Sequence, residues 1–197
     1  MYKKGPFILE YLEMTHNTIT KALECHPRLS AFRFDMRFPI DFNLNIDLEN
    51  GIIQRFVDSL KAKIKYDREK SAQRYSRVHT TEVRYVWARE CSSDGNPHPH
   101  YHFLLLLNQD AYHSLGLINS DKKNMSSRII EAWASAIGLS LDQARGLVYF
   151  PNNGIYRLNQ KNGNAGISPL FERVSYMCKV NTKRYGDGRH AFGCSRS

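Results

Sequence analysis

The chain has 197 residues, with 28 lysine and arginine residues against 19 aspartate and glutamate residues and a formal charge of +9. This length supports one well-buried core, so we expect a single domain over residues 1–197. The positive charge favours polyanionic partners, with nucleic acid ahead of an anionic membrane surface. Because no secretory signal is present and no apolar run approaches the ~18 residues of a spanning helix, the sequence predicts a soluble protein of the cytoplasm.

Four cysteines are scattered along the chain without a C-x-x-C pair: Cys25, Cys91, Cys178 and Cys194. Disulfides persist mainly in secreted proteins, and closed zinc sites have characteristic ligand spacings. We therefore expect all four to be free thiols.

A helical lead-in over residues 1–29 precedes the first predicted strand, AFRFDMRF at residues 31–38. Its apolar side chains alternate with Arg33, Asp35 and Arg37, which is the two-residue period of a half-buried strand. From Asn50 the apolar residues recur at helical spacing, and lysines populate the remaining surface. This pattern predicts a helix with one packed face and one basic, solvated face.

The segment NPHPHYHFLLLLN, residues 96–108, places three histidines at every second position ahead of an apolar run. In an extended strand His98, His100 and His102 lie on one face. Because the run beyond them is apolar on both faces, we expect a central strand that is covered on both sides. Histidines at the mouth of such a strand are candidates for a functional site.

Another strand, EVRYVWARE at residues 82–90, precedes the histidine strand, and the linker between them carries Asp-Gly and Asn-Pro turn signals. The two strands are therefore predicted to form an antiparallel hairpin. If Glu90 lies opposite His100, then Ala88 lies opposite His102. This register puts the Glu90 carboxylate beside both imidazoles. The small methyl group of Ala88 leaves space next to His102.

Beyond the hairpin, the spacing predicts a helix ending at Gly138, a strand around GLVYF and a short strand over residues 155–158. The last helix is predicted to begin with Ser168 as its N-cap and Pro169 at the first helical position, and to end near Gly186. Together these elements predict an α+β domain, a central antiparallel β-sheet with flanking helices packed mainly on one face.

Two imidazoles and a carboxylate suit a divalent ion such as Mn²⁺, Mg²⁺, Zn²⁺ or Fe²⁺, with positions left open for substrate oxygens. The predicted ligands are His100, His102 and Glu90. His98 offers an alternative histidine pair shifted by two residues. Glu82 and Asp35 remain rival acidic ligands, because they also fall on polar strand faces.

Tyr176 and Lys179 are three residues apart and so project from the same face of a helix. A phenol has a pKa of about 10, and a nearby ammonium group or metal ion favours its ionised, nucleophilic form. Such a pair could attack a phosphodiester. Taken alone, the two residues are more simply a packed tyrosine and a solvated lysine.

Together, HYH at residues 100–102 and YMCK at residues 176–179 resemble the HUH endonucleases that initiate rolling-circle replication. That superfamily carries a His-hydrophobe-His pair on a central strand of an RRM-like palm, and a Y-x-x-K helix downstream. The wider sequence, from WAREC to HAFGCSR, is similar to the inovirus and prophage replication-protein family of the YagK/YfjJ type, over residues 30–195.

The resemblance implies a metal-dependent nickase and strand transferase. His100, His102 and Glu90 would bind Mn²⁺ or Mg²⁺, Tyr176 would form a 5′-phosphotyrosyl bond, and Lys179 would orient the phenolate or balance its charge. Tyr185 is off the face, so one nucleophile is expected. The alternatives are a single-tyrosine transposase or relaxase with the same chemistry, and a non-catalytic DNA-binding regulator on the same fold.

The expected partner is single-stranded or hairpin DNA of a replication origin, lying over the sheet face that presents Arg33, Arg37 and Arg84. The sequence contains no G-x-x-x-x-G-K phosphate-binding loop. A host helicase and polymerase would therefore supply unwinding and synthesis.

Overall fold

The computed structural model describes residues 5–91, 97–118, 120–163, 166–181, 183 and 186–196. The helices are α1 (Leu9–Cys25), α2 (Ile46–Asn50), α3 (Ile52–Arg74), α4 (Met125–Ile137), α5 (Leu141–Ala144) and α6 (Ile167–Val174), with 3₁₀ helices η1 (Gln160–Asn162) and η2 (Ser175–Cys178). The strands are β1 (Arg28–Met36), β2 (Arg84–Cys91), β3 (Pro99–Asn108), β4 (Val148–Tyr149), β5 (Ile155–Asn159) and β6 (Phe192–Cys194).

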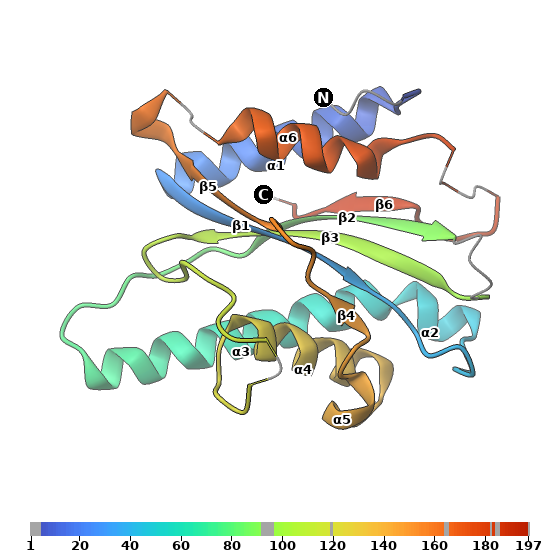
Figure 1. Ribbon diagram of the computed structural model, residues 1–197, viewed down its shortest axis with the longest axis horizontal. Coiled ribbons are helices and arrows are strands. Elements are labelled where there is room, and N and C mark those ends of the chain that lie inside the picture. The colour runs from blue at the N-terminus through green and yellow to red at the C-terminus, as the bar shows by residue number, and fades with distance from the viewer. Residues whose placement is uncertain are drawn as a thin grey trace.

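The strands form one six-stranded sheet in the order β4-β1-β3-β2-β6, with β5 paired to β1 beside β4. Every pairing in it is antiparallel. The histidine strand β3 lies between β1 and β2, which confirms its predicted central place (Figure 1). The α+β fold with an antiparallel sheet and flanking helices is also confirmed.

Helices cover both faces of the sheet, so the expectation that they pack mainly on one face is wrong. In Figure 1, α1 and α6 lie on one side of the sheet and α3, α4 and α5 on the other. Phe32 and Phe34 of β1 join the core with α3 and α4, whereas Leu29 and Ala31 join the core with α1 and α6. A central strand that is apolar on both faces requires this double cover, because either bare face would expose several leucines to water.

The last helix is shorter than predicted. Gly166, at a φ of 91°, is the N-cap of α6, which places Pro169 in the third helical position instead of the first. The α-helix ends at Val174 and continues only as the 3₁₀ turn η2. After η2 the chain is extended at Lys179, and the Ile8 N–H donates to the Cys178 carbonyl at 2.8 Å.

Helix α4 and the short strands β4 and β5 lie where the sequence predicts them, whereas α2, α5 and β6 are not predicted. Helix α4 ends at Gly138, whose φ of 72° is the left-handed conformation that glycine adopts without steric cost. The four cysteines are free thiols. Among the described helices, none combines the length and the apolar character needed to cross a bilayer.

Candidate functional site

Three side chains of the central hairpin converge at one point of the sheet. Glu90 on β2 lies opposite His100 on β3, and the next pair is Ala88 and His102, so the predicted register is confirmed. His102 Nε2 is 3.0 Å from Glu90 Oε2, and His100 Nε2 is 3.9 Å from the same oxygen. One ligand atom from each residue lies within 4.8 Å of the others, so this cluster could hold a metal ion.

The cluster lies on the sheet face that packs against α1 and α6. Glu90 and His102 are buried, and His100 is partly buried. Along the same face the strands continue as Val86 and Leu104 into the apolar core beneath α1, because alternate residues of a strand share a face. The cluster therefore stands where the apolar lining of the strands gives way to polar side chains.

Asp35 holds His102 from the opposite side. It faces His102 in the β1–β3 pairing, and its Oδ1 accepts a hydrogen bond from His102 Nδ1. This bond directs Nε2 toward Glu90, an arrangement in which a carboxylate fixes the ring of a metal-binding histidine. Asp35 is thus placed as the orienting partner of His102, and Glu90 is the carboxylate that faces both histidines.

Arg33 belongs to the same network. It is buried, and its Nη1 forms an ion pair with Asp35 Oδ2 at 2.6 Å. Its Nη2 also lies 2.8 Å from His102 Nδ1, but a guanidinium group only donates. Nδ1 cannot accept from Arg33 while it donates to Asp35, and the contact with Asp35 is the closer one. We therefore assign the Nδ1 proton to the bond with Asp35, whose charge Arg33 neutralises.

Lys183 is the member of the network that sequence reasoning missed. Its side chain is fully buried, and its Nζ lies 2.8 Å from Glu90 Oε1. This bond leaves Oε2 turned toward the two histidines. The two residues are 93 positions apart, and no motif spacing connects them. The nearest signal in the sequence is that Lys183 follows Lys179 by one helical turn, but the helix does not continue that far.

Burial, hydrogen bonds and neighbouring charges together set the protonation states of Glu90, His102 and His100. Burial raises the pKa of Glu90, but the hydrogen bond and charge of His102, with Lys183, outweigh it and lower the pKa to about 2. Burial lowers the pKa of His102, but hydrogen bonds to Asp35 and Glu90 raise it overall. Burial and the charge of His102 lower the pKa of His100 to about 4. A metal ion would therefore meet one neutral imidazole and displace a proton from His102 Nε2.

Tyr176 lies beside the cluster. Its ring is 5.5 Å from that of His102, centroid to centroid, at an interplanar angle of 76°. Lys179 Nζ is 4.8 Å from the centre of the Tyr176 ring. The structure thus brings the two predicted residues together, although by a 3₁₀ turn instead of an α-helix. In that geometry, residues three apart lie almost directly above one another.

A cleft of about 580 Å³ gives access to this place from outside. Arg33, Asp35, His102 and Tyr176 line its inner part. The outer walls come from α6 and from the segments around β4 and β5, through Tyr149, Pro151, Tyr156, Pro169, Glu172 and Arg173. The cleft therefore joins the tyrosine and one histidine of the cluster to solvent, between aromatic and charged walls.

The three arginines predicted to contact DNA are separated. Arg33 lies inside the cluster, as described above. Arg37 is exposed beyond the end of β1, and its charge contributes to the lowered pKa of His100. Arg84 is buried at the far end of β2, where it forms an ion pair with Glu82 at 3.2 Å. Glu82, a rival metal ligand in the sequence, is thus engaged away from the histidines.

His98 also lies outside the cluster. Its Nε2 is 3.2 Å from the Ile40 carbonyl oxygen, and its ring packs edge-on against Phe38 at 5.9 Å. The later histidine pair is therefore the one that faces Glu90. Tyr185, which the sequence analysis set aside as a nucleophile, lies outside the described residues.

Fold and site together define the class of the protein: an antiparallel α+β domain with a His-x-His and carboxylate cluster on its central strands and a Tyr-x-x-Lys turn above it. Within that class, the chain belongs to the YagK/YfjJ C-terminal domain family, whose model matches residues 1–195. The match includes helix α1, which precedes the region of resemblance seen in the sequence.

Two relatives from Escherichia coli (strain K12) match almost end to end. YfjJ is 39% identical over 204 residues, which cover 98% of this chain and 96% of YfjJ. YagK is 36% identical over 200 residues, covering 98% of this chain and 95% of YagK. No solved structure matches this chain.

Proposed function

We propose that this protein is a metal-dependent endonuclease and strand transferase of single-stranded DNA, of the HUH type, which initiates rolling-circle replication through a phosphotyrosyl intermediate. The observation that carries the proposal is the position of Tyr176, whose ring lies 5.5 Å from that of His102 in the predicted metal cluster. A DNA-binding regulator on the same fold would have no need of this arrangement.

The donor set fits a hard or borderline divalent ion. Glu90, His100 and His102 would hold Mn²⁺ or Mg²⁺ through one oxygen and two nitrogens. When bound, the ion supplies Lewis acidity that polarises and positions the scissile phosphate. The surrounding residues prepare the ligands for it. Asp35 fixes the ring of His102, and Lys183 holds Glu90 by its other oxygen.

Tyr176 acts as the nucleophile. Its phenolic oxygen attacks the phosphorus atom as the phenol loses its proton, a bond forms from that oxygen to phosphorus, and the bond from phosphorus to the 3′ oxygen breaks. The leaving oxygen takes a proton and becomes a free 3′-OH that can prime synthesis. Lys179, at 4.8 Å from the ring, favours the ionised phenol by its charge. The covalent bond conserves the energy needed for religation, so no nucleotide cofactor is required.

The substrate strand enters by the cleft beside Tyr176. Arg173 lines this cleft and can contact phosphates there, and the exposed Arg37 can contact them beyond the end of β1, while the buried Arg33 stabilises the cluster. We expect single-stranded or hairpin DNA to compete better than blunt duplex, because the cleft is lined by aromatic rings that can stack on unpaired bases. Affinity should fall steeply with salt; an affinity independent of salt would contradict this part of the proposal.

The test is covalent capture. The protein is incubated with labelled single-stranded DNA and Mn²⁺, and a protein-linked product is sought and located by mass spectrometry. Tyr176→Phe removes one hydroxyl, so we expect it to eliminate the adduct and leave DNA binding nearly intact. Tyr156→Phe is the matched control, since Tyr156 lines the same cleft and should not carry the nucleotide. Lys179→Ala should slow the reaction without abolishing it.

Two outcomes would overturn the proposal. An adduct located on Tyr156 or any other side chain would refute the nucleophile. If no single-stranded substrate gave an adduct, while Tyr176→Phe bound DNA as the wild type does, the regulator hypothesis would replace this one. Removing the metal with EDTA should abolish cleavage, as should His100→Ala or His102→Ala, and full activity in EDTA would remove the metal from the mechanism.

A further inference from the structure

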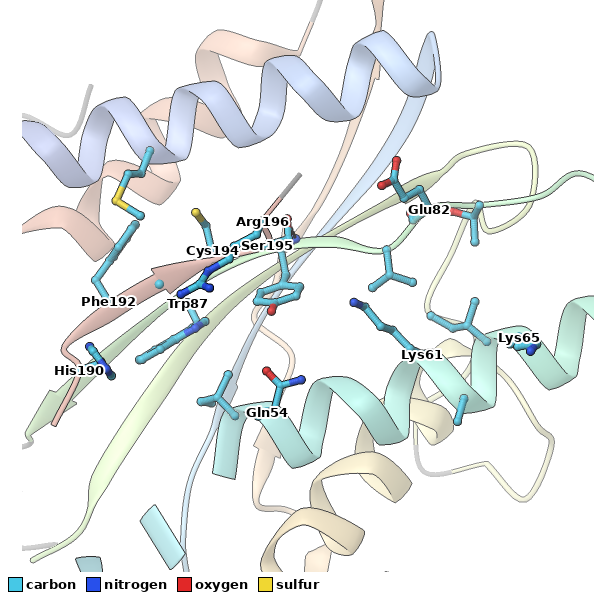
Figure 2. Close-up of a pocket in the computed structure, with 18 of the residues that line it drawn as sticks. Gln54, Lys61, Lys65, Glu82, Trp87, His190, Phe192, Cys194, Ser195 and Arg196 are labelled. Carbon is cyan, nitrogen blue, oxygen red and sulfur yellow. Dashed lines mark hydrogen bonds between the residues drawn. The ribbon is translucent and has the colours of Figure 1, made fainter. Parts of the chain in front are cut away.

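A second concave surface lies on the opposite face of the sheet from the metal cluster. It is a groove of about 1140 Å³ between helix α3 and the β2–β6 edge of the sheet (Figure 2). Its floor contains Tyr85 and Trp87 of β2, which point toward α3, whereas Val86 and Ala88 between and beyond them point toward α1. The groove and the metal cluster therefore use opposite faces of the same strand.

The two aromatic rings of the floor pack against aromatic rings of the neighbouring strand β3. Tyr85 stacks on Phe103 at 5.5 Å with an interplanar angle of 22°, and Trp87 meets Tyr101 edge-on at 6.0 Å. Both remain partly exposed. Alternate residues of a strand are about 6.6 Å apart, so the floor presents two separate rings in a row. Rings fixed in this way lose little conformational entropy when a planar ligand stacks on them.

The edge strand makes room for the indole. Gly193 pairs with Trp87 across β2 and β6. A Cβ on Gly193 would come within 2.7 Å of Trp87 Nε1 and 2.8 Å of its Cε2. Glycine at this position therefore lets the indole lie over the backbone of β6, inside the groove.

The charged side chains of the groove are mainly cationic. Lys61, Lys65, Arg68 and Arg196 line it, together with only two carboxylates, Glu69 and Glu82. Both carboxylates have cationic neighbours: Glu69 is 3.9 Å from Lys65, and Glu82 pairs with Arg84. Within the described part of the chain, Lys61 and Arg196 have no ion-pair partner. Figure 2 shows Lys61 extending from α3 toward β2, and Arg196 just beyond the end of β6.

We propose that this groove binds single-stranded DNA, as a second contact for a strand on the face away from the metal cluster. Two fixed aromatic rings flanked by cationic side chains are the combination that recognises unstacked bases and their phosphates. A duplex would present no free base faces to Tyr85 and Trp87. The choice of DNA over RNA rests on the proposed function; the stacking and the charge rest on the groove alone.

Tryptophan fluorescence gives a local test. The chain has two tryptophans, and Trp133 is fully buried in the core with its indole N–H bonded to the Arg37 carbonyl. A base that stacks in the groove should quench Trp87 alone. We expect an oligothymidylate, added in EDTA so that the metal cluster is not engaged, to quench the wild-type emission. Trp87→Phe should abolish the response, and Trp87→Ala should weaken binding at least about fivefold.

Charge reversal gives the matched comparison. Lys61→Glu alters the groove, whereas Lys70→Glu makes the same change on α3 at an exposed site outside it, next to the Tyr66 ring. If Lys61 contacts a phosphate, Lys61→Glu should reduce the salt slope of the quenching titration by about 0.7. Lys70→Glu should leave the slope unchanged.

The proposal fails if the oligothymidylate binds without quenching Trp87, or if the two charge reversals weaken binding equally. Equal quenching by blunt duplex would also refute it, since charge alone would then explain binding, and tighter binding of oligouridylate would refute DNA as the ligand. Quenching without a covalent adduct would support the groove and remove the proposed nuclease. An adduct without quenching would support the proposed nuclease and remove the groove as a binding site.

Discussion

Removing the buried ion pair between Lys183 and Glu90 should lower the free energy of unfolding by a measurable amount. Lys183→Met keeps most of the volume but removes the charge, leaving the Glu90 carboxylate buried and still in contact with His102. Breaking a buried pair on one side costs about 3–5 kcal/mol. Because His102 still donates to Glu90, we expect the lower value, about 3 kcal/mol. For a chain of this size, that lowers Tm by about 6–12 °C.

Thermal unfolding followed by circular dichroism measures this loss. Lys122→Met is the control, because Lys122 is exposed and should change stability by no more than about 0.5 kcal/mol. In the wild type, Glu90 contributes stability above its unfolded pKa of 4.5, and that contribution is lost as the pH falls through about 2. Without Lys183 the folded pKa rises, so acid destabilisation should begin at a higher pH. A Lys183→Met variant with wild-type Tm and acid profile would refute the buried pair.

Other changes test the candidate metal cluster and the groove. Glu90→Ala should weaken Mn²⁺ binding, measured by calorimetry, roughly 10- to 100-fold, and unchanged affinity would return Asp35 as the ligand. The pKa of His102 is raised by its two carboxylates, so below that pKa the affinity for Mn²⁺ should fall by about tenfold per pH unit as the proton competes; a pH-independent Kd would contradict this. Gly193→Ala should displace the Trp87 indole and diminish quenching by oligothymidylate, while adduct formation continues; quenching equal to the wild type would show that the indole is not confined there.

The hairpin that carries the metal cluster could be predicted from the sequence because its signals are local. The turn signals predict that the two strands pair, and once Glu90 is placed opposite His100, the two-residue period puts Ala88 opposite His102. A shift of one residue would have turned the histidines to the other face. The apolar run after His102 does not oppose that shift, because both of its faces are buried; the shift is opposed at the histidine end, where it would separate Glu90 from His100 and His102.

The parts that the sequence could not predict depend on contacts between distant segments. Arg33 and Arg37 are equivalent in the strand pattern, but only Arg33 is enclosed, because Asp35 and His102 meet it under α6. The chain at and after the end of η2 is held by backbone hydrogen bonds from Ile8 to Cys178 and from Val180 to Pro6, which no helix propensity encodes. Lys183 follows this turn, so its approach to Glu90 depends on the same distant bonds.

The bridge between Phe7 and Lys179 has a consequence for the order in which the protein is completed during translation. The three predicted metal ligands lie between residues 90 and 102, and they can assemble once the hairpin and β1 have left the ribosome. Tyr176, Lys183 and strand β6 emerge after the hairpin, and the segment around Lys179 docks on residues 6–8, which emerge before it. A nascent chain that ends before η2 would therefore hold a metal cluster without the proposed nucleophile. The proposed cleavage would begin only when these two distant segments have met.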